Sequence, residues 1–155
     1  MSALLEVENL KVEFNTLRGR LTAVRDLTFS LKHGETLGVV GESGCGKSLT
    51  SLAVMGLLPD NAIVTADKMV FDGVDLLNSS DETLRKLRGD SISMIFQDPM
   101  TSLNPSFTVE YQLDEILKVH NKGTKAERRE RILELMLQVG IPDPESRLSA
   151  YPHEL

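Results

Sequence analysis

The alternation of hydrophobic and polar residues near the N-terminus predicts two β-strands. Apolar residues alternate with charged ones from Leu4 to Phe14, apart from a break in phase at Asn9-Leu10, and a second run with partial period-two character extends from Leu21 to Leu31. The mostly polar residues 15–20 between the two runs predict a turn. The chain is therefore expected to open with an antiparallel pair of strands.

Two short apolar runs predict further strands. Residues 36–40 (Thr-Leu-Gly-Val-Val) have the composition of a strand covered on both faces, and residues 92–96 (Ile-Ser-Met-Ile-Phe) form a second such run ending at Gln97. Between them, Asp72-Gly73 predicts the turn of a hairpin that joins residues 69–71 to residues 74–77. The first part of the chain is thus rich in strands.

Helical spacing and helix caps mark four further segments, residues 47–58, 81–87, 109–120 and 125–139. Pro59 is expected to stop the first helix, Ser80 or Asp81 to cap the second, and Gly140 to end the last. The pattern predicts an α/β fold with a strand-rich part, residues 1–97, followed by a helical part, residues 98–155.

Residues 41–48 (Gly-Glu-Ser-Gly-Cys-Gly-Lys-Ser) match the pattern G-x-x-x-x-G-K-[ST] at every fixed position. They lie between a predicted strand and a predicted helix, which is the context that this phosphate-binding pattern requires. The glycines let backbone N–H groups approach phosphate oxygens, and the start of the helix favours an anion. Lys47 supplies a charge for the β- and γ-phosphates, and the Ser48 hydroxyl is a suitable Mg²⁺ ligand.

The alternative interpretation of this loop is a glycine-rich turn that binds no ligand. The loop also leaves the chemistry open, because kinases, molecular switches, motors and transport ATPases share it.

Composition narrows the classes of protein. The 155 residues are 41% hydrophobic, enough for a core, and the formal net charge of −6 argues against a nucleic-acid-binding surface. The basic residues between 122 and 131 alternate with glutamates and predict a solvated helix face. The single cysteine cannot form an intramolecular disulfide, which fits a reducing compartment. No apolar run approaches the roughly 20 residues that span a bilayer, and the N-terminal residues do not have the pattern of a secretory signal. We expect a soluble cytoplasmic protein.

Two further stretches, together with the loop, make the chain similar to the ATP-binding subunit of an ABC transporter. They are residues 94–105 (Met-Ile-Phe-Gln-Asp-Pro-Met-Thr-Ser-Leu-Asn-Pro) and residues 151–155 (Tyr-Pro-His-Glu-Leu). The sequences of these two stretches resemble those of the bacterial dipeptide/oligopeptide importers. Relatives within this subfamily also transport nickel and glutathione. This resemblance implies a P-loop NTPase core with an N-terminal antiparallel β-subdomain and the start of an α-helical subdomain.

The resemblance also implies individual roles. Gln97 would reach Mg²⁺ and the attacking water, and its loop would contact the membrane subunit. Phe14 would stack on adenine, and Val24 would be a second apolar contact to the base. The alternatives are a glutamine that only ends a strand and, for Phe14, an ordinary core residue alternating with Val12.

The expected cofactors are ATP and Mg²⁺, with Lys47 and Gln97 in catalysis and with Ser48 and Gln97 as metal ligands. The nucleotide-binding set is expected to comprise Phe14, Val24, Gly41, Glu42, Ser43, Gly44, Cys45, Gly46, Lys47, Ser48 and Leu49. The histidines His33, His120 and His153 are scattered and predict no metal site.

The expected partners are the transmembrane permease subunits and a second ATP-binding subunit, in a homodimer or a heterodimer, at the inner face of the cell membrane. No nucleic acid and no direct membrane insertion are expected. Leu155 corresponds to the first residue of the family's Leu-Ser-Gly-Gly signature, so the signature, Walker B and switch regions are expected to be lacking. We therefore expect a truncated chain that binds ATP and hydrolyses it poorly.

Three alternatives stay open at this stage. The chain could belong to another ABC ATPase, such as a nickel or glutathione importer. It could be a small-molecule kinase, against which the residues around Gln97 argue. It could also be a non-catalytic fragment that docks on a membrane subunit without using ATP.

Overall fold

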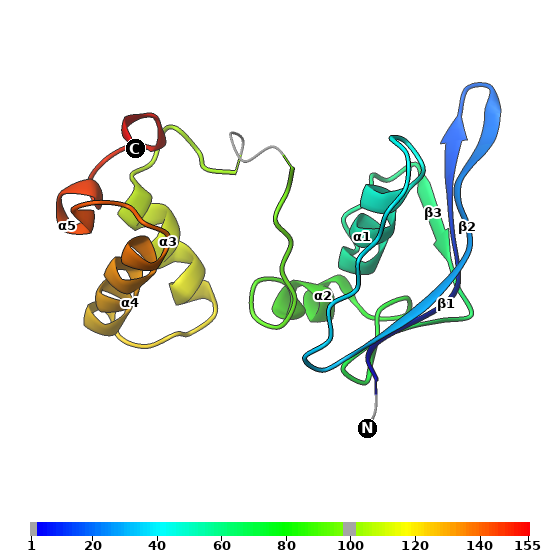
Figure 1. Ribbon diagram of the computed structural model, residues 1–155, viewed down its shortest axis with the longest axis horizontal. Helices are drawn as coiled ribbons and strands as arrows, with labels where there is room; N and C mark the ends of the chain where they lie inside the picture. The colour runs from blue at the N-terminus through cyan, green and yellow to red at the C-terminus, as the bar shows by residue number, and fades with distance from the viewer. Residues whose placement is uncertain (1–2, 98–101) are drawn as a thin grey trace. The chain divides into compact units, whose positions relative to one another are not determined.

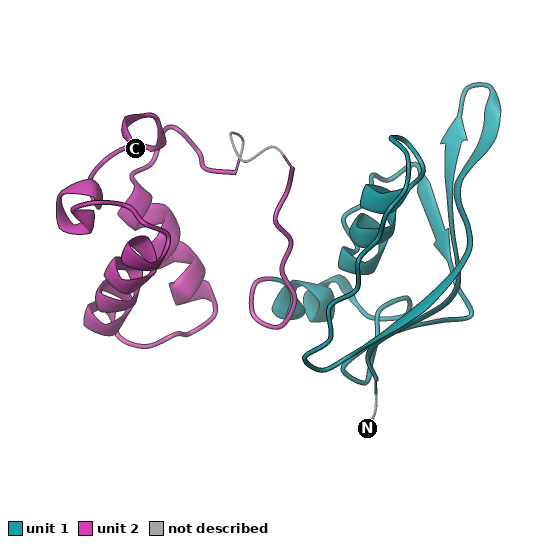
Figure 2. Cartoon of the chain, viewed as in Figure 1, with its two compact units in different colours: residues 1–88 teal, residues 89–155 magenta. Residues whose placement is uncertain are grey.

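The computed structural model describes residues 3–97 and 102–155 (Figure 1). The chain divides into two compact units, Met1–Arg88 and Gly89–Leu155, coloured separately in Figure 2. The residues Asp98, Pro99, Met100 and Thr101, which belong to the motif behind the family resemblance, lie outside the described residues. The functional boundary expected between residues 97 and 98 remains a prediction.

A long antiparallel hairpin opens the first unit, as predicted. Strand β1 (Ala3–Thr16) pairs with β2 (Gly19–Lys32), and Val12 lies opposite Val24. The strands extend further into the polar segment than expected because the turn is tight. The Thr16 hydroxyl donates to the carbonyl oxygen of Gly19 at 2.7 Å, and Gly19 takes a positive φ of 112° that glycine adopts easily.

The break in phase at Asn9-Leu10 is a β-bulge. The register shifts between Val7 and Leu10, and Asn9 has a φ of 52°. The Asn9 N–H donates to the Thr28 hydroxyl at 2.9 Å instead of to a ladder carbonyl. Because the bulge inserts one residue, Val7 and Leu10 are both fully buried although three positions separate them.

The residues that the structure describes form a five-stranded sheet. Four of its strands follow the order β2-β1-β4-β5, and the fifth, β3 (Ala62–Thr65), pairs with β1. Strands β4 (Lys68–Phe71) and β5 (Val74–Asp75) form the predicted hairpin, with Asp72 and Gly73 both at positive φ in its turn. Strand β3 was not predicted. Its four residues lie between turns and are too few to show a period.

Helix α1 (Lys47–Met55) contacts β1 and β2 and buries Ala53, Val54 and Met55. The prediction that it continues to Leu58 is wrong. Gly56 adopts the left-handed conformation, and its N–H donates to the Ala53 carbonyl at 3.0 Å, which ends the helix before Pro59 is reached.

Helix α2 (Asp81–Leu87) begins as predicted. The Ser80 hydroxyl caps it by accepting from the Thr83 N–H at 3.2 Å.

The two short apolar runs do not form the strands that the sequence predicts. Residues 36–40 have no regular structure, and the side chain of Val40 is 93% exposed. Residues 92–96 contain only an isolated bridge at Ile92, and Ile95 is 97% exposed. A strand of this kind requires hydrogen-bonding neighbours, and no described strand pairs with either run.

The second unit is helical. It contains α3 (Val109–Val119), α4 (Lys125–Gln138), the short α5 (Pro144–Arg147) and a 3₁₀ helix, η2 (Pro152–Glu154). Its core consists of the buried side chains of Val109, Ile132, Met136 and Leu148. The predicted helices 109–120 and 125–139 are confirmed. Each prediction extends one residue too far, because it includes the C-cap residue, which is His120 for α3 and Val139 for α4.

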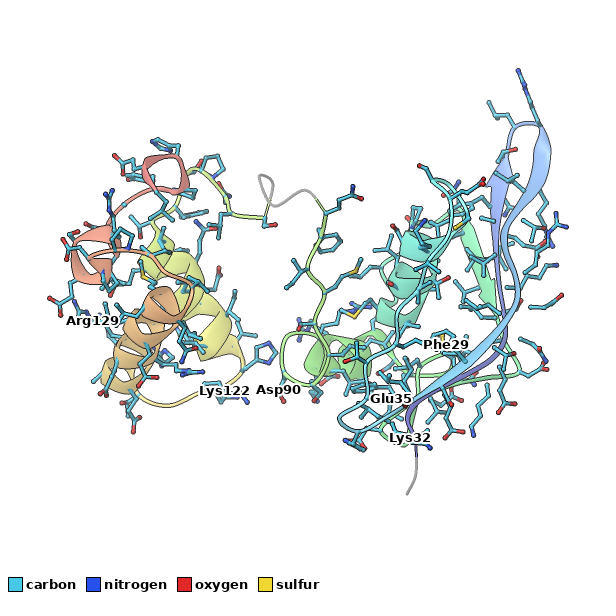
Figure 3. All side chains as sticks on the ribbon, in the orientation of Figure 1. Phe29, Lys32, Glu35, Asp90, Lys122 and Arg129 are labelled. Atoms are coloured by element: carbon cyan, nitrogen blue, oxygen red, sulfur yellow. The ribbon has the colours of Figure 1, made fainter. Side chains whose placement is uncertain are left out.

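Two of the ion pairs that join segments of this unit also lower the pKa of a carboxyl group. Arg128 donates through Nε to Asp114 Oδ1 at 2.7 Å and connects α4 to α3. This hydrogen bond is the main cause that holds the pKa of Asp114 below its usual value. Lys122 pairs with Asp90, as Figure 3 shows, and lowers the pKa of that carboxyl group in the same way.

Candidate nucleotide-binding site

The segment that leads to the phosphate loop, residues 41–48, leaves β2 through a closed turn. The Lys32 N–H donates to Glu35 Oε2 at 2.8 Å, and the Glu35 N–H donates to the Lys32 carbonyl at 3.1 Å (Figure 3). Gly34, between them, has a positive φ of 74°. The turn therefore fixes the direction in which the chain leaves the sheet toward residues 41–48.

The phosphate loop runs directly into α1. Its glycines Gly44 and Gly46 have positive φ values of 82° and 94°, and Gly46 is the N-cap of the helix. Both conformations are ones that glycine adopts without strain. The Cys45 N–H donates to the Glu42 carbonyl at 3.3 Å, which closes the loop on itself.

The start of α1 favours an anion. The first N–H groups of a helix lack partners within the helix, and its dipole is positive there. No acidic residue lies in the first turn of α1 to oppose that potential. Ser48 is exposed in this turn, and Leu49 is partly buried beside it.

Lys47 holds the two ends of the loop together. Its Nζ donates to the carbonyl oxygen of Gly41 at 2.6 Å and to that of Glu42 at 2.7 Å, and it lies 3.5 Å from Cys45 Sγ. The amine therefore lies over the loop at the start of α1. Glu42, Ser43 and Cys45 are exposed around it.

The loop also meets the β1–β2 hairpin. A Cβ atom on Gly46 would lie 2.9 Å from the Ala23 carbonyl oxygen and 3.0 Å from Val24 Cγ2. The structure thus brings Val24, which is 7% exposed, next to the loop. Phe14 is partly buried on β1, opposite Leu21 of β2 and Ala62 of β3.

Thr50 supports the loop, and sequence reasoning missed it. Its hydroxyl and its N–H both donate to the Gly46 carbonyl, at 3.0 and 2.9 Å, and the residue is 8% exposed. The sequence signal for this role is a Thr four residues after Gly46, since a hydroxyl at that spacing can donate to a backbone carbonyl of the preceding helical turn.

Gln97 lies in the second unit and is exposed, without regular structure. Its role beside the phosphate loop remains a prediction. Within the described part of the chain, no group of three or more His, Cys, Asp or Glu side chains is arranged to hold a metal ion. Among residues 3–97 and 102–155, no helix has both the length and the apolar character needed to cross a bilayer.

The chain is similar to ATP-binding proteins of peptide transport. It is 51% identical over 153 residues to the dipeptide transport ATP-binding protein DppD of Escherichia coli (strain K12), covering 99% of this chain and 47% of that protein. DppD of Bacillus subtilis (strain 168) is 51% identical over 155 residues, covering 99% and 46%. The oligopeptide transport protein OppD of Escherichia coli (strain K12) is 50% identical over 152 residues, covering 98% and 45%. The chain thus spans about half the length of these relatives.

The fold is similar to that of solved ATP-binding cassettes. The dimeric cassette MJ0796 in a post-hydrolysis state with ADP and Pi has a TM-score of 0.79 at 22% identity, covering 97% of this chain and 62% of the other. This likeness confirms the predicted fold class. The family model described as ABC transporter matches residues 24–155. The chain therefore belongs to the ABC transporter family.

Proposed function

We propose that this chain is the nucleotide-binding part of an ATP-binding subunit of an ABC importer for dipeptides or oligopeptides. The observation that carries the proposal is the position of Lys47, whose amine lies over the loop at the start of α1. The names of the relatives support the choice of peptides as the transported class.

In this proposal MgATP binds with its β- and γ-phosphates against the loop N–H groups and the Lys47 amine. The Ser48 hydroxyl would hold Mg²⁺, which prefers hard oxygen ligands. Val24, beside Gly46, contacts the base, and Phe14 stacks on adenine. By the family resemblance, Gln97 would be the residue that reaches the metal ion and the attacking water. Phosphoryl transfer to water then depends on position and on charge stabilisation rather than on a covalent intermediate.

The proposed partners are the permease subunits of the importer and a second ATP-binding subunit, identical or related. Through these partners the protein would lie at the cytoplasmic face of the cell membrane. The two solved cassettes with a similar fold are themselves described as dimeric, which is consistent with the second partner.

The nucleotide part of the proposal is tested with Lys47→Ala in the 155-residue chain. Because the variant loses a charge-assisted donor to phosphate, we expect MgATP binding to weaken at least about tenfold by isothermal titration calorimetry. Lys86→Ala is the matched control, since this exposed lysine pairs with Glu82 on α2. Equal affinities of Lys47→Ala and the wild-type chain would contradict the proposal.

The transport part is tested in the source cells. Disruption of the gene is expected to abolish uptake of a labelled dipeptide and to leave uptake of glutathione and of nickel unchanged. The wild-type gene should restore uptake, and the gene carrying Lys47→Ala should not. Loss of nickel or glutathione uptake alone would replace the peptide assignment with one of those solutes.

A further inference from the structure

Arg88 lies against the C-terminal end of α1, the helix whose N-terminus carries the phosphate loop. Its Nε donates to the Met55 carbonyl at 2.7 Å, and its Nη2 donates to the Gly56 carbonyl at 2.8 Å. The residue is partly buried and immediately follows α2. One guanidinium therefore bridges two successive carbonyl groups.

These two carbonyls are among those that the backbone cap leaves. The last carbonyl groups of a helix have no partner inside the helix. The Gly56 N–H takes the Ala53 carbonyl, and the Leu57 N–H takes the Leu52 carbonyl at 2.9 Å. Arg88 donates to two further carbonyls from the position just after α2, and places a positive charge at the end of α1 where the dipole is negative.

The approach of α2 to this end of α1 is close. A Cβ atom on Gly56 would lie 2.7 Å from Arg88 Nη2 and 3.2 Å from Leu84 Cδ1. The Arg88 N–H in turn donates to the Leu84 carbonyl at 3.0 Å, so its backbone is tied to the last turn of α2. Glycine at position 56 permits this contact as well as the left-handed cap.

We propose that Arg88 is a positioning residue for the phosphate loop, acting through α1. The helix has nine residues, so only about 13 Å separates the Arg88 contact from Lys47 and Ser48. A rigid helix held at one end presents its other end in one orientation, which holds Lys47 and the loop N–H groups in place for phosphate. This inference rests on the proposed function in taking phosphate to be the ligand of the loop.

The test compares Arg88→Gln with Arg85→Gln in the 155-residue chain. Arg85 is exposed on α2, the helix that Arg88 follows, so its substitution makes the same change of charge away from the contact. Two quantities are measured: the Kd for MgATP, and the rate at which a maleimide labels Cys45 without nucleotide. Cys45 is the only cysteine of the chain and is exposed in the loop, so its labelling reports on loop geometry directly.

We expect Arg88→Gln to weaken MgATP binding about fivefold and to change the labelling rate of Cys45, while Arg85→Gln matches the wild type in both. Arg88→Lys keeps the charge but replaces the planar fork of the guanidinium with a single nitrogen, so it should restore part of the affinity. A variant that is less stable by circular dichroism but unchanged in both readouts would show that Arg88 is a structural cap only, and would overturn the inference.

The two readouts separate this inference from the proposed function. If the wild-type chain binds no MgATP, the proposed function fails, and the labelling rate of Cys45 still tests the link from Arg88 to the loop. If Arg88→Gln does not fold, Gly56→Ala disturbs the same contact from the α1 side and is judged by the same two measurements. Unchanged labelling of Cys45 in the folded variant refutes the link.

Discussion

The carbonyl oxygen of Ala23 lies where a side chain on Gly46 would have to go, because a Cβ atom there would approach to 2.9 Å. Gly46 also has a φ of 94°, which other residues adopt only with strain. We expect Gly46→Ala to lower the free energy of unfolding by about 1–3 kcal/mol and to abolish MgATP binding. Thermal denaturation and calorimetric titration measure the two effects.

Gly73→Ala is the control for this substitution. Gly73 has a similar φ of 79°, but no atom of the described residues lies within 4 Å of a Cβ atom there. It should therefore show the cost of backbone strain alone and should bind MgATP normally. If the two variants behave alike, the contact between the loop and β2 has no role in binding.

Bound MgATP is expected to protect Cys45 from maleimide. The thiol is exposed within the loop, 3.5 Å from the Lys47 amine, so phosphate at this loop would cover it. Mass spectrometry should show slower labelling with MgATP than without it. The protection should vanish in Lys47→Ala, and equal labelling of the wild type in both conditions would contradict a phosphate site here.

Ile132→Ala should strongly destabilise the helical unit. The Ile132 side chain is fully buried in the core of that unit, so its removal leaves a cavity and should cost about 2–5 kcal/mol in a urea denaturation followed by circular dichroism. Leu137→Ala, also on α4, removes a side chain that is 61% exposed and should change stability by less than about 0.5 kcal/mol. Similar losses in both variants would show that this core is not the one described.

Asp114 should make the chain sensitive to acid. Its pKa is lowered in the folded state, chiefly by the hydrogen bond from Arg128, below the usual value of 3.8. A carboxyl group with a lowered folded pKa stabilises the fold above its unfolded pKa, and this stabilisation is lost as the pH falls through the folded pKa. Asp114→Asn should therefore be less stable than the wild type near neutral pH and should lose less further stability on acidification.

Urea midpoints at about pH 6 and about pH 3 measure this difference. Glu115→Gln serves as the control, because it removes an exposed carboxylate from the same helix. A wild-type midpoint that changes no more with pH than that of Asp114→Asn would refute the role of the pair with Arg128.

The parts of the fold that local sequence signals specify could be predicted. The alternation of apolar and polar residues predicted the β1–β2 hairpin, and the capping residues Ser80 and Gly140 predicted helix ends. The runs 36–40 and 92–96 were predicted wrongly, because a strand without paired neighbours is not specified by its own composition.

The parts of the candidate site also differ in whether the sequence predicts them. The tight loop at residues 41–48 before α1 could be predicted because its glycines and Lys47 act within eight residues, whereas its binding of phosphate stays a prediction. The contact of Val24 with Gly46 and that of Arg88 with the end of α1 join segments more than 20 residues apart, and no local pattern indicates them.

The hydrogen bonds of Lys47 also bear on ligand selectivity. The amine already donates to the carbonyl oxygens of Gly41 and Glu42. A nucleotide bound as proposed would therefore not give it its first acceptors but would replace neutral acceptors with anionic ones. The net gain then grows with the charge of the replacing group, because hydrogen bonds between charged partners are stronger than those to neutral acceptors. An exchange of this kind favours triphosphates over monophosphates and gives a neutral nucleoside no advantage at this amine.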